Sequence, residues 1–275
     1  MTYATMMVSL AVKQPNDALL EVTGQLAAQF SAKAIGAAAA MFSPPMYFLE
    51  GALGQQMIDE GEAIIRQRLV ELESQFRAAM QGCAKDVEWR QAMEVPARFV
   101  AREARAADLV IVGGERGALS DTFAIAGPGD LVLQAGRPLL VVPADVKWLD
   151  LRSAVVAWKD CPEARRAVAD ALPLLARVKE VTVAGIAEEE GGQAELRRQT
   201  EDVVGWLSRH GVEARAQVPE RCGNAVVQLD RIAADTGAGV VVAGAYGRSR
   251  LREWVLGGVT QHLINQTARC VLLSR

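Results

Sequence analysis

Short apolar runs alternate along the chain with longer segments in which apolar residues recur every three or four positions. The clearest runs are residues 110–112, 139–142, 155–156, 240–242 and 271–273. Nearly continuous apolar runs of this kind are typical of parallel strands that are covered on both faces. The longer segments have helical periodicity. Strands that alternate with helices predict βαβ units and therefore an α/β fold.

The two halves of the chain repeat the same order of elements. A strand, a glycine-containing loop, a short helix and a last strand follow one another at 109–142 and again at 240–273. The first strands, expected at Met7–Val12 and Ala154–Lys159, also correspond. Repeats of this length are whole domains rather than solenoid units.

We therefore predict two tandem doubly wound domains, at 1–143 and 152–275, with Pro143–Leu151 containing the linker. Each has a Rossmann-like arrangement around an open parallel sheet of five strands. The first domain is the longer one between its first and fourth strands. We place its extra residues in an extended loop at 41–58, which contains Pro44-Pro45 and two glycines.

The second half is divided by the same criteria. Its strands are expected at about 153–158, 180–186, 213–218, 239–244 and 269–274, and its helices at about 162–177, 192–210, 224–236 and 257–267. Ligands of doubly wound sheets bind beyond the carboxyl ends of the strands, so the chemistry is expected there.

The strongest candidate for a binding element is the glycine loop that follows the strand at 239–244. Gly244 and Gly247 would let the backbone turn sharply and approach a ligand. Gly257 and Gly258 open the next helix, whose free N–H groups favour an anion, and Arg248 adds positive charge. The alternative is that these glycines only make a tight turn and a helix cap.

The spacing of this loop resembles the signature of the universal stress proteins. G-x-x-G, nine residues and G-G-V stand at 244–259, where the family has G-x-x-G, nine residues and G-[Ser/Thr]. Residues 155–175 are similar to the family's first strand and helix. With the repeat, the resemblance covers essentially the whole chain and implies a tandem two-domain universal stress protein.

The resemblance implies an adenine-nucleotide site in the second half, for ATP with Mg²⁺. Asp160 matches the acidic residue that contacts the nucleoside, and Ile186 matches an apolar residue of the adenine pocket. Trp158, where many members have a smaller residue, either stacks on adenine or fills the pocket.

The same resemblance places the phosphates on the loop that runs from Gly244 through Gly247, Arg248 and Gly257 to Gly258 and Val259. Family members that bind nucleotide usually have Ser or Thr at the position of Gly258, so one hydroxyl is missing here. Losing such a hydrogen bond weakens binding by about 0.5–1.5 kcal/mol.

The corresponding positions of the first half depart from the pattern. Residues 113–117 do not keep the G-x-x-G spacing, and Glu115 places a negative charge there. Residues 127–130 form a turn with Pro and Asp instead of a glycine pair, and no acidic residue matches Asp160. We therefore expect no nucleotide in this half, although a different ligand could bind between Met41 and Ile58.

Composition narrows the choice of function. The chain has 275 residues and a formal net charge of -3, so it lacks the basic surface that non-specific nucleic-acid binding needs. The four cysteines are far apart in the sequence, which favours free thiols in the cytoplasm. Neither they nor the two histidines have the spacing of metal ligands, so we expect no metal cluster. His210 and His262 are interpreted as ordinary helix residues, and the thiol of Cys161 as unreactive. The longest apolar stretch is too short to span a membrane.

No general base or nucleophile stands in a catalytic pattern, so we do not expect an enzyme. Two alternatives to nucleotide binding stay open: a scaffold with both sites inactive, and a small-molecule sensor with 41–58 as a lid. The resemblance further implies that the halves pair through Pro138–Val142 and Cys270–Ser274, and that two chains form a homodimer.

Overall fold

The computed structural model describes residues 2–43, 52–114, 121–187, 192–220, 224–246, 258–265 and 268–275. Among the helices in these ranges, none combines the length and the apolar character that crossing a bilayer requires.

Strands and helices alternate through most of the described chain. The strands are β1 (Thr5–Leu10), β2 (Lys33–Ala39), β3 (Asp86–Ala92), β4 (Leu109–Gly113), β5 (Leu139–Val142), β6 (Ser153–Trp158), β7 (Glu180–Gly185), β8 (Ala214–Gln217), β9 (Val240–Gly244) and β10 (Cys270–Ser274). The helices are α1 (Asp17–Phe30), α2 (Ala52–Met80), α3 (Pro96–Glu103), α4 (Pro128–Gln134), α5 (Pro162–Leu175), α6 (Gln193–Arg209), α7 (Ala225–Asp235) and α8 (Gly258–Asn265), with a short 3-10 helix η2 (Ala104–Ala106).

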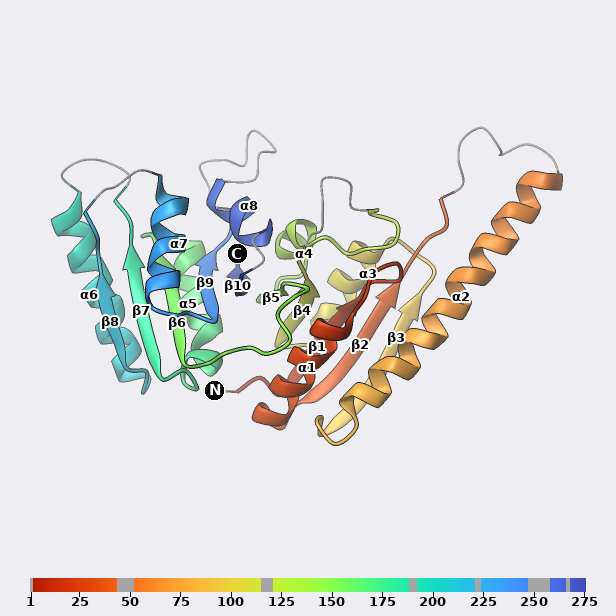
Figure 1. The fold of residues 1–275 in the computed structure, drawn as a ribbon, viewed down its shortest axis with the longest axis horizontal. Helices are drawn as coiled ribbons and strands as arrows, with labels where there is room; N and C mark the ends of the chain where they lie inside the picture. Colours follow the sequence, from red (N-terminus) through yellow and green to blue (C-terminus); the bar gives the residue numbers. More distant parts are fainter. Residues whose placement is uncertain are drawn as a thin grey trace.

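The ten strands form one sheet in the order β3-β2-β1-β4-β5-β10-β9-β6-β7-β8 (Figure 1). Within each half all five strands are parallel, which confirms the predicted α/β fold. The two halves meet where β5 and β10 pair antiparallel, with Val141 opposite Val271 and Leu140 opposite Leu272.

The pairing of the halves through their last strands, which the resemblance implies, joins the two sets of five strands in one continuous sheet. All the residues of β5 and β10 are buried. If these strands were open edges, they would expose apolar side chains and unpaired backbone N–H and C=O groups. Pairing β5 with β10 satisfies those groups within one chain.

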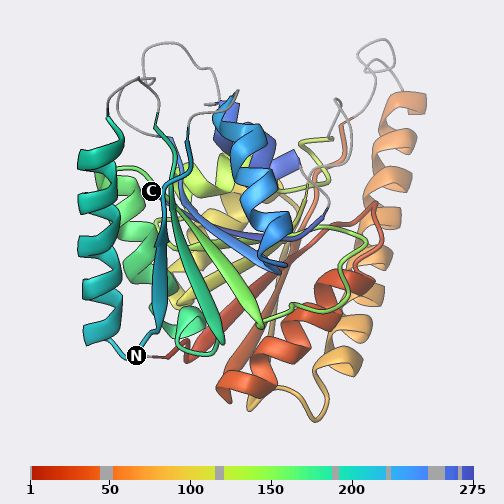
Figure 2. The ribbon, with the colours of Figure 1, turned by 60° about the vertical axis from the view of Figure 1, so that its left-hand side comes forward.

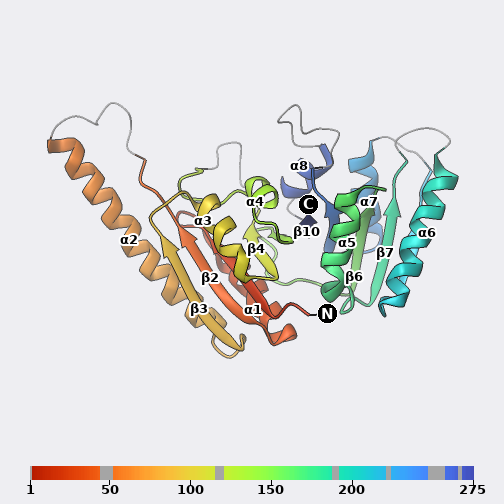
Figure 3. The same ribbon diagram turned by 180° about the vertical axis from the view of Figure 1, so that it is seen from behind.

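Helices cover both faces of the sheet. The apolar faces of α1, α2, α5 and α6 pack on one side, around a cluster that includes Leu26, Phe76 and Leu174. The apolar faces of α3, α4, α7 and α8 pack on the other side, around Leu131 and Leu263. Figure 2 shows α7 and α8 side by side, and Figure 3 shows α2 and α6 at opposite ends of the sheet.

The first strand lies two residues earlier than expected, at Thr5–Leu10 instead of Met7–Val12. The side chain of Asn16 explains why it ends early. Its Oδ1 accepts a hydrogen bond from the backbone N–H of Ala11 at 2.9 Å, and its Nδ2 donates to the Ala11 carbonyl at 2.9 Å. The amide therefore occupies the backbone groups that would otherwise extend the strand.

The expected loop at 41–58 is shorter than predicted, because α2 begins at Ala52. Gly54, read as a loop glycine, is buried inside this helix. Residues 44–51 lie outside the described part of the chain. Phe42 packs on α2 at Gly61, where a Cβ would come within 2.3 Å of the ring. The absence of a side chain at Gly61 therefore seats Phe42 on the helix.

The turn expected at 127–130 is instead the start of α4. Gly127 is the N-cap residue and Pro128 is the first residue of the helix. Proline fits this position because its missing N–H has no partner in the first turn.

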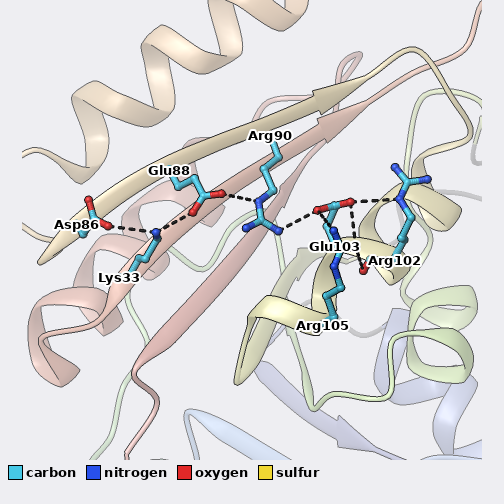
Figure 4. Close-up of polar contacts among 7 residues, drawn as sticks. All are labelled: Lys33, Asp86, Glu88, Arg90, Arg102, Glu103 and Arg105. Carbon is cyan, nitrogen blue, oxygen red and sulfur yellow. Dashed lines mark hydrogen bonds and ion pairs between the residues drawn. The ribbon is translucent and has the colours of Figure 1, made fainter.

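A chain of charged side chains runs from β2 and the edge strand β3 to α3 and η2 (Figure 4). Its members are Lys33, Asp86, Glu88, Arg90, Arg102, Glu103 and Arg105. The carboxylate of Glu103 accepts from Arg90 at 2.8 Å and from Arg102 at 3.2 Å. Burial alone would raise the pKa of Glu103, but these hydrogen bonds and the charge of Arg105 outweigh it and hold the pKa below its usual value.

Candidate functional site

The carboxyl ends of β6, β7 and β9 lie together at one edge of the second half. The parallel register places Trp158 opposite Gly185 and Ala157 opposite Ala243. The predicted site residues Trp158, Ile186 and Gly244 therefore stand at the same edge, on three adjacent strands. This is the position where doubly wound sheets hold their ligands.

Trp158 points into the core on the α5 and α6 side of the sheet. It is 8% exposed and belongs to the same apolar cluster as Ala164 and Val168. Its Nε1 is buried and makes no hydrogen bond to any described residue. Its side chain therefore packs inside the core, and its role at the adenine pocket stays a prediction.

Ile186 lies on the opposite face. It follows β7, is half-buried and packs against the cluster under α7 and α8. Ile186 and Trp158 are therefore on different sides of the sheet. Only Ile186 is on the side where α8 begins.

Asp160 follows β6 and is engaged in an ion pair. The guanidinium Nη2 of Arg165, in the first turns of α5, donates to its Oδ1. The side chains are 45% exposed for Asp160 and 59% exposed for Arg165. Exposed pairs are weak, about 0–1 kcal/mol, so the pair can open at small cost.

Gly244 is needed for packing within the protein. A Cβ at this position would lie 2.5 Å from the backbone N of Ala164 and 2.6 Å from the carbonyl carbon of Glu163. The end of β9 thus contacts the first turn of α5 directly. The sequence suggested that Gly244 lets the backbone approach a ligand. In the structure, the backbone at Gly244 closely approaches α5.

Tyr246, two residues later, has φ +57, a left-handed conformation that is uncommon for a residue with a side chain. Its hydroxyl donates to the carbonyl of Gly129 in α4, at 3.4 Å. The start of the glycine loop therefore contacts the first half of the chain.

The loop itself is described only at its ends. Gly247, Arg248 and Gly257 lie outside the described residues. Gly258 is exposed at the start of α8, and a Cβ added to it would meet no atom of the described residues within 4 Å. Val259 is half-buried and packs against the cluster under α7 and α8.

One contact near the site was not expected from the sequence. His262 Nε2 of α8 and Asp230 Oδ2 of α7 are 2.6 Å apart, and Arg269 Nη1 lies 4.0 Å from Asp230 Oδ1. The sequence predicts that Asp230 and His262 lie on helices, at 224–236 and 257–267. It does not predict their pairing, because 32 residues separate them and the contact depends on how α7 and α8 pack.

The remaining histidine and the cysteine at the helix start agree with their sequence interpretation. His210 is the C-cap residue of α6 and is followed by Gly211 at φ +77, a conformation that favours glycine. Cys161 is the N-cap residue of α5, and burial raises the pKa of its thiol, so it is not an activated thiolate. No three metal-binding side chains gather in the described part of the chain.

The equivalent edge of the first half is covered by its own chain. The N–H of Val12 donates to the carbonyl of Ala124 at 3.4 Å, and that of Met41 to the carbonyl of Phe123 at 2.8 Å. Lys13 pairs with Asp121 at 2.7 Å. The segment at 121–124 therefore lies across the ends of β1 and β2; residues 115–120 of the preceding loop are outside the described chain.

Comparisons with solved structures support the fold. The chain is similar to a universal stress protein from Archaeoglobus fulgidus DSM 4304, with a TM-score of 0.77 and 14% identity over 98% of this chain and 96% of the other. This chain has the fold of a tandem universal stress protein.

Two further structures have the same layout. A candidate universal stress protein from Pseudomonas aeruginosa UCBPP-PA14 has a TM-score of 0.62 and 14% identity over 99% of this chain and 93% of the other. A functionally unknown protein from Pseudomonas aeruginosa PAO1 has a TM-score of 0.60 and 14% identity over 99% and 92%. No protein-family model matches the sequence. No curated protein matches it either.

Proposed function

We propose that this chain is a stress-response protein of the universal stress type and binds one adenine nucleotide, with Mg²⁺, in its second half. The observation that carries the proposal is the meeting of the carboxyl ends of β6, β7 and β9 at one edge of the sheet. The helix α8, whose first residue is exposed, packs against α7 on the face of the sheet where Ile186 lies. Backbone N–H groups at the start of a helix favour a phosphate there.

The described residues fit such a ligand in part. The exposed N-terminus of α8 at Gly258 and Val259 would hold a phosphate, and the half-buried Ile186 offers an apolar wall on the same side of the sheet. Gly247, Arg248 and Gly257 belong to the proposed site by sequence. Gly244 supports the loop through its contact with α5, and Trp158 supports the sheet edge from the core.

The first half is proposed to serve as a structural partner without nucleotide. Its segment at 121–124 lies across the ends of β1 and β2. This edge of the first half is equivalent to the edge where the second half has its candidate site. No catalytic step is proposed. A cytoplasmic location, from the separated cysteines, and a homodimer, from the resemblance, stay predictions.

A scaffold without nucleotide is the second candidate function, and one observation favours it. The Asp160 carboxylate, proposed for the nucleoside, is paired with Arg165. The lid hypothesis falls mostly on residues 44–51, which lie outside the described residues. Phe42, just before them, is seated on Gly61 of α2.

Isothermal titration of the purified chain with ATP and Mg²⁺ tests the proposal. We expect micromolar to submillimolar binding that a Gly247→Val variant abolishes.

Gly258→Ser restores the family's hydroxyl at a position where a Cβ meets no described atom, and should tighten ATP binding about two- to tenfold. Gly113→Ser is the matched control in the first half, because a Cβ at Gly113 also meets no atom of the described residues within 4 Å, and it should leave affinity unchanged. Absence of binding at millimolar ATP would favour the scaffold.

A further inference from the structure

A cleft lies where the two halves are joined, near the amino ends of β6 and β7. It therefore lies at the opposite edge of the second half from the proposed nucleotide site. Its volume is about 560 Å³, which is within the range of small-molecule sites. It is lined by Gln25 and Gln29 of α1, by Trp148–Arg152 of the linker, and by Arg177 and Lys179 between α5 and β7.

The linker that forms one wall of this cleft is held in place. The side-chain amide of Gln25 donates to the carbonyl of Leu149 at 2.8 Å, and its Oε1 accepts from the N–H of Leu149 at 2.9 Å. Leu149 is completely buried. The backbone N–H of Lys179 donates to the carbonyl of Leu151 at 3.2 Å. The wall is therefore tied both to α1 and to the start of β7, as a preformed site requires.

Two cations of the cleft lack a carboxylate partner among the described residues. Arg177 instead stacks on Phe30, with its guanidinium carbon 4.4 Å from the ring centroid, and Lys179 is exposed. Arg152 differs, because it forms an ion pair with Asp150 at 2.6 Å. The cleft thus has a net positive charge in a chain whose net charge is -3. Stacking on Phe30 leaves the N–H groups of Arg177 available to an anion.

Two further groups in the cleft could contact a ligand. The indole of Trp148 is 65% exposed and offers an apolar face. The side-chain Oε1 of Gln29 is buried and accepts no hydrogen bond from any described residue. An unpaired buried acceptor costs about 1–3 kcal/mol, so a hydroxyl donor from a ligand or a water would stabilise it.

We propose that this cleft binds a small multivalent anion that carries phosphate or carboxylate groups. Arg177 and Lys179 hold its charges, and Trp148 covers it. The ligand would contact α1 of the first half, the linker, and the residues of the second half that lead into the amino end of β7. Its binding would therefore stabilise the junction between the halves. The inference is independent of the proposed nucleotide site.

Pyrophosphate and citrate are the probes, because they present the two chemistries separately. We expect one of them to bind the wild-type chain by titration calorimetry at fixed ionic strength, and to raise its melting temperature. The stronger probe identifies phosphate or carboxylate as the preferred group. The double variant Arg177→Gln/Lys179→Gln should lose at least about tenfold in affinity. Lys179→Gln alone, an exposed change, keeps the test valid if the double variant folds poorly.

Two controls separate this cleft from other sites. Arg98→Gln/Lys85→Gln removes the same charges from exposed positions elsewhere and should bind as the wild type does. Gly247→Val should also keep the response, because it alters only the nucleotide loop. Failure of both probes at about 1 mM overturns the proposal. So does an equal loss in the control pair, or a loss confined to Gly247→Val.

Discussion

Gly244 at the end of β9 lies directly against Ala164 in the first turn of α5, with room for no Cβ between them. We therefore expect Gly244→Ala to destabilise the protein by about 1–3 kcal/mol, because the helix backbone would have to move. Gly113→Ala is the matched control, since Gly113 ends β4 in the first half and a Cβ there meets no atom of the described residues within 4 Å. Thermal or urea unfolding of both variants measures the difference. Equal stability of the two variants would contradict this explanation of Gly244.

Arg165 competes with the proposed ligand for Asp160. If Asp160 contacts the nucleoside, Arg165→Gln should free its carboxylate and tighten ATP binding about two- to tenfold. Arg198→Gln, which breaks a similar exposed pair with Glu195 on α6, should leave affinity unchanged. Titration calorimetry of both variants decides the point. Weaker binding in Arg165→Gln would assign the guanidinium, and not the carboxylate, to the ligand.

The Glu103 network should make stability depend on pH on the acid side. Hydrogen bonds from arginines hold the folded pKa of Glu103 below its unfolded value. The carboxylate therefore contributes stability above the unfolded pKa of about 4.3, and this contribution is lost as the pH falls through the folded pKa.

Glu103→Gln tests the network directly. We expect it to cost about 1–2 kcal/mol near neutral pH, because three arginine side chains lose their shared negative charge and the amide keeps only one acceptor oxygen. The difference in the free energy of unfolding between the variant and the wild type should shrink as the pH is lowered below 4. Urea unfolding at each pH measures this difference. A difference that stays constant over this range would mean that the ionised carboxylate is not what stabilises the region.

Asp230 should help to dock α8 on α7 through His262. Asp230→Asn weakens the 2.6 Å contact, and we expect a loss of about 0.5–1.5 kcal/mol in the free energy of unfolding. Asp235→Asn on the same helix is the matched control, because its 3.8 Å pair with Arg231 is exposed and should contribute little. If both variants lose the same stability, the His262 contact is no more than a surface pair.

Local patterns predicted most of the elements, and the second half was predicted closely. Apolar runs and helical periodicity placed β6 at Ser153–Trp158 and α7 within one residue of each end, as observed. Predictions were less accurate where one side chain competes with the backbone. Asn16 ends β1 early, and the seat for Phe42 at Gly61 belongs to a helix that was partly read as a loop.

By itself, the sequence determined the repeat, the parallel strands and the edge at which a site is expected, because these follow from residue types at short spacing. The tertiary structure decided which segments and side chains contact one another. It set the antiparallel register in which β5 and β10 join the halves, placed Gly244 against α5 and Trp158 in the core, and brought His262 to Asp230. The linker cleft between α1 and β7 also became visible only there. Contacts between segments far apart in the chain depend on how elements pack and in which register, and spacing along one segment carries no information about that packing.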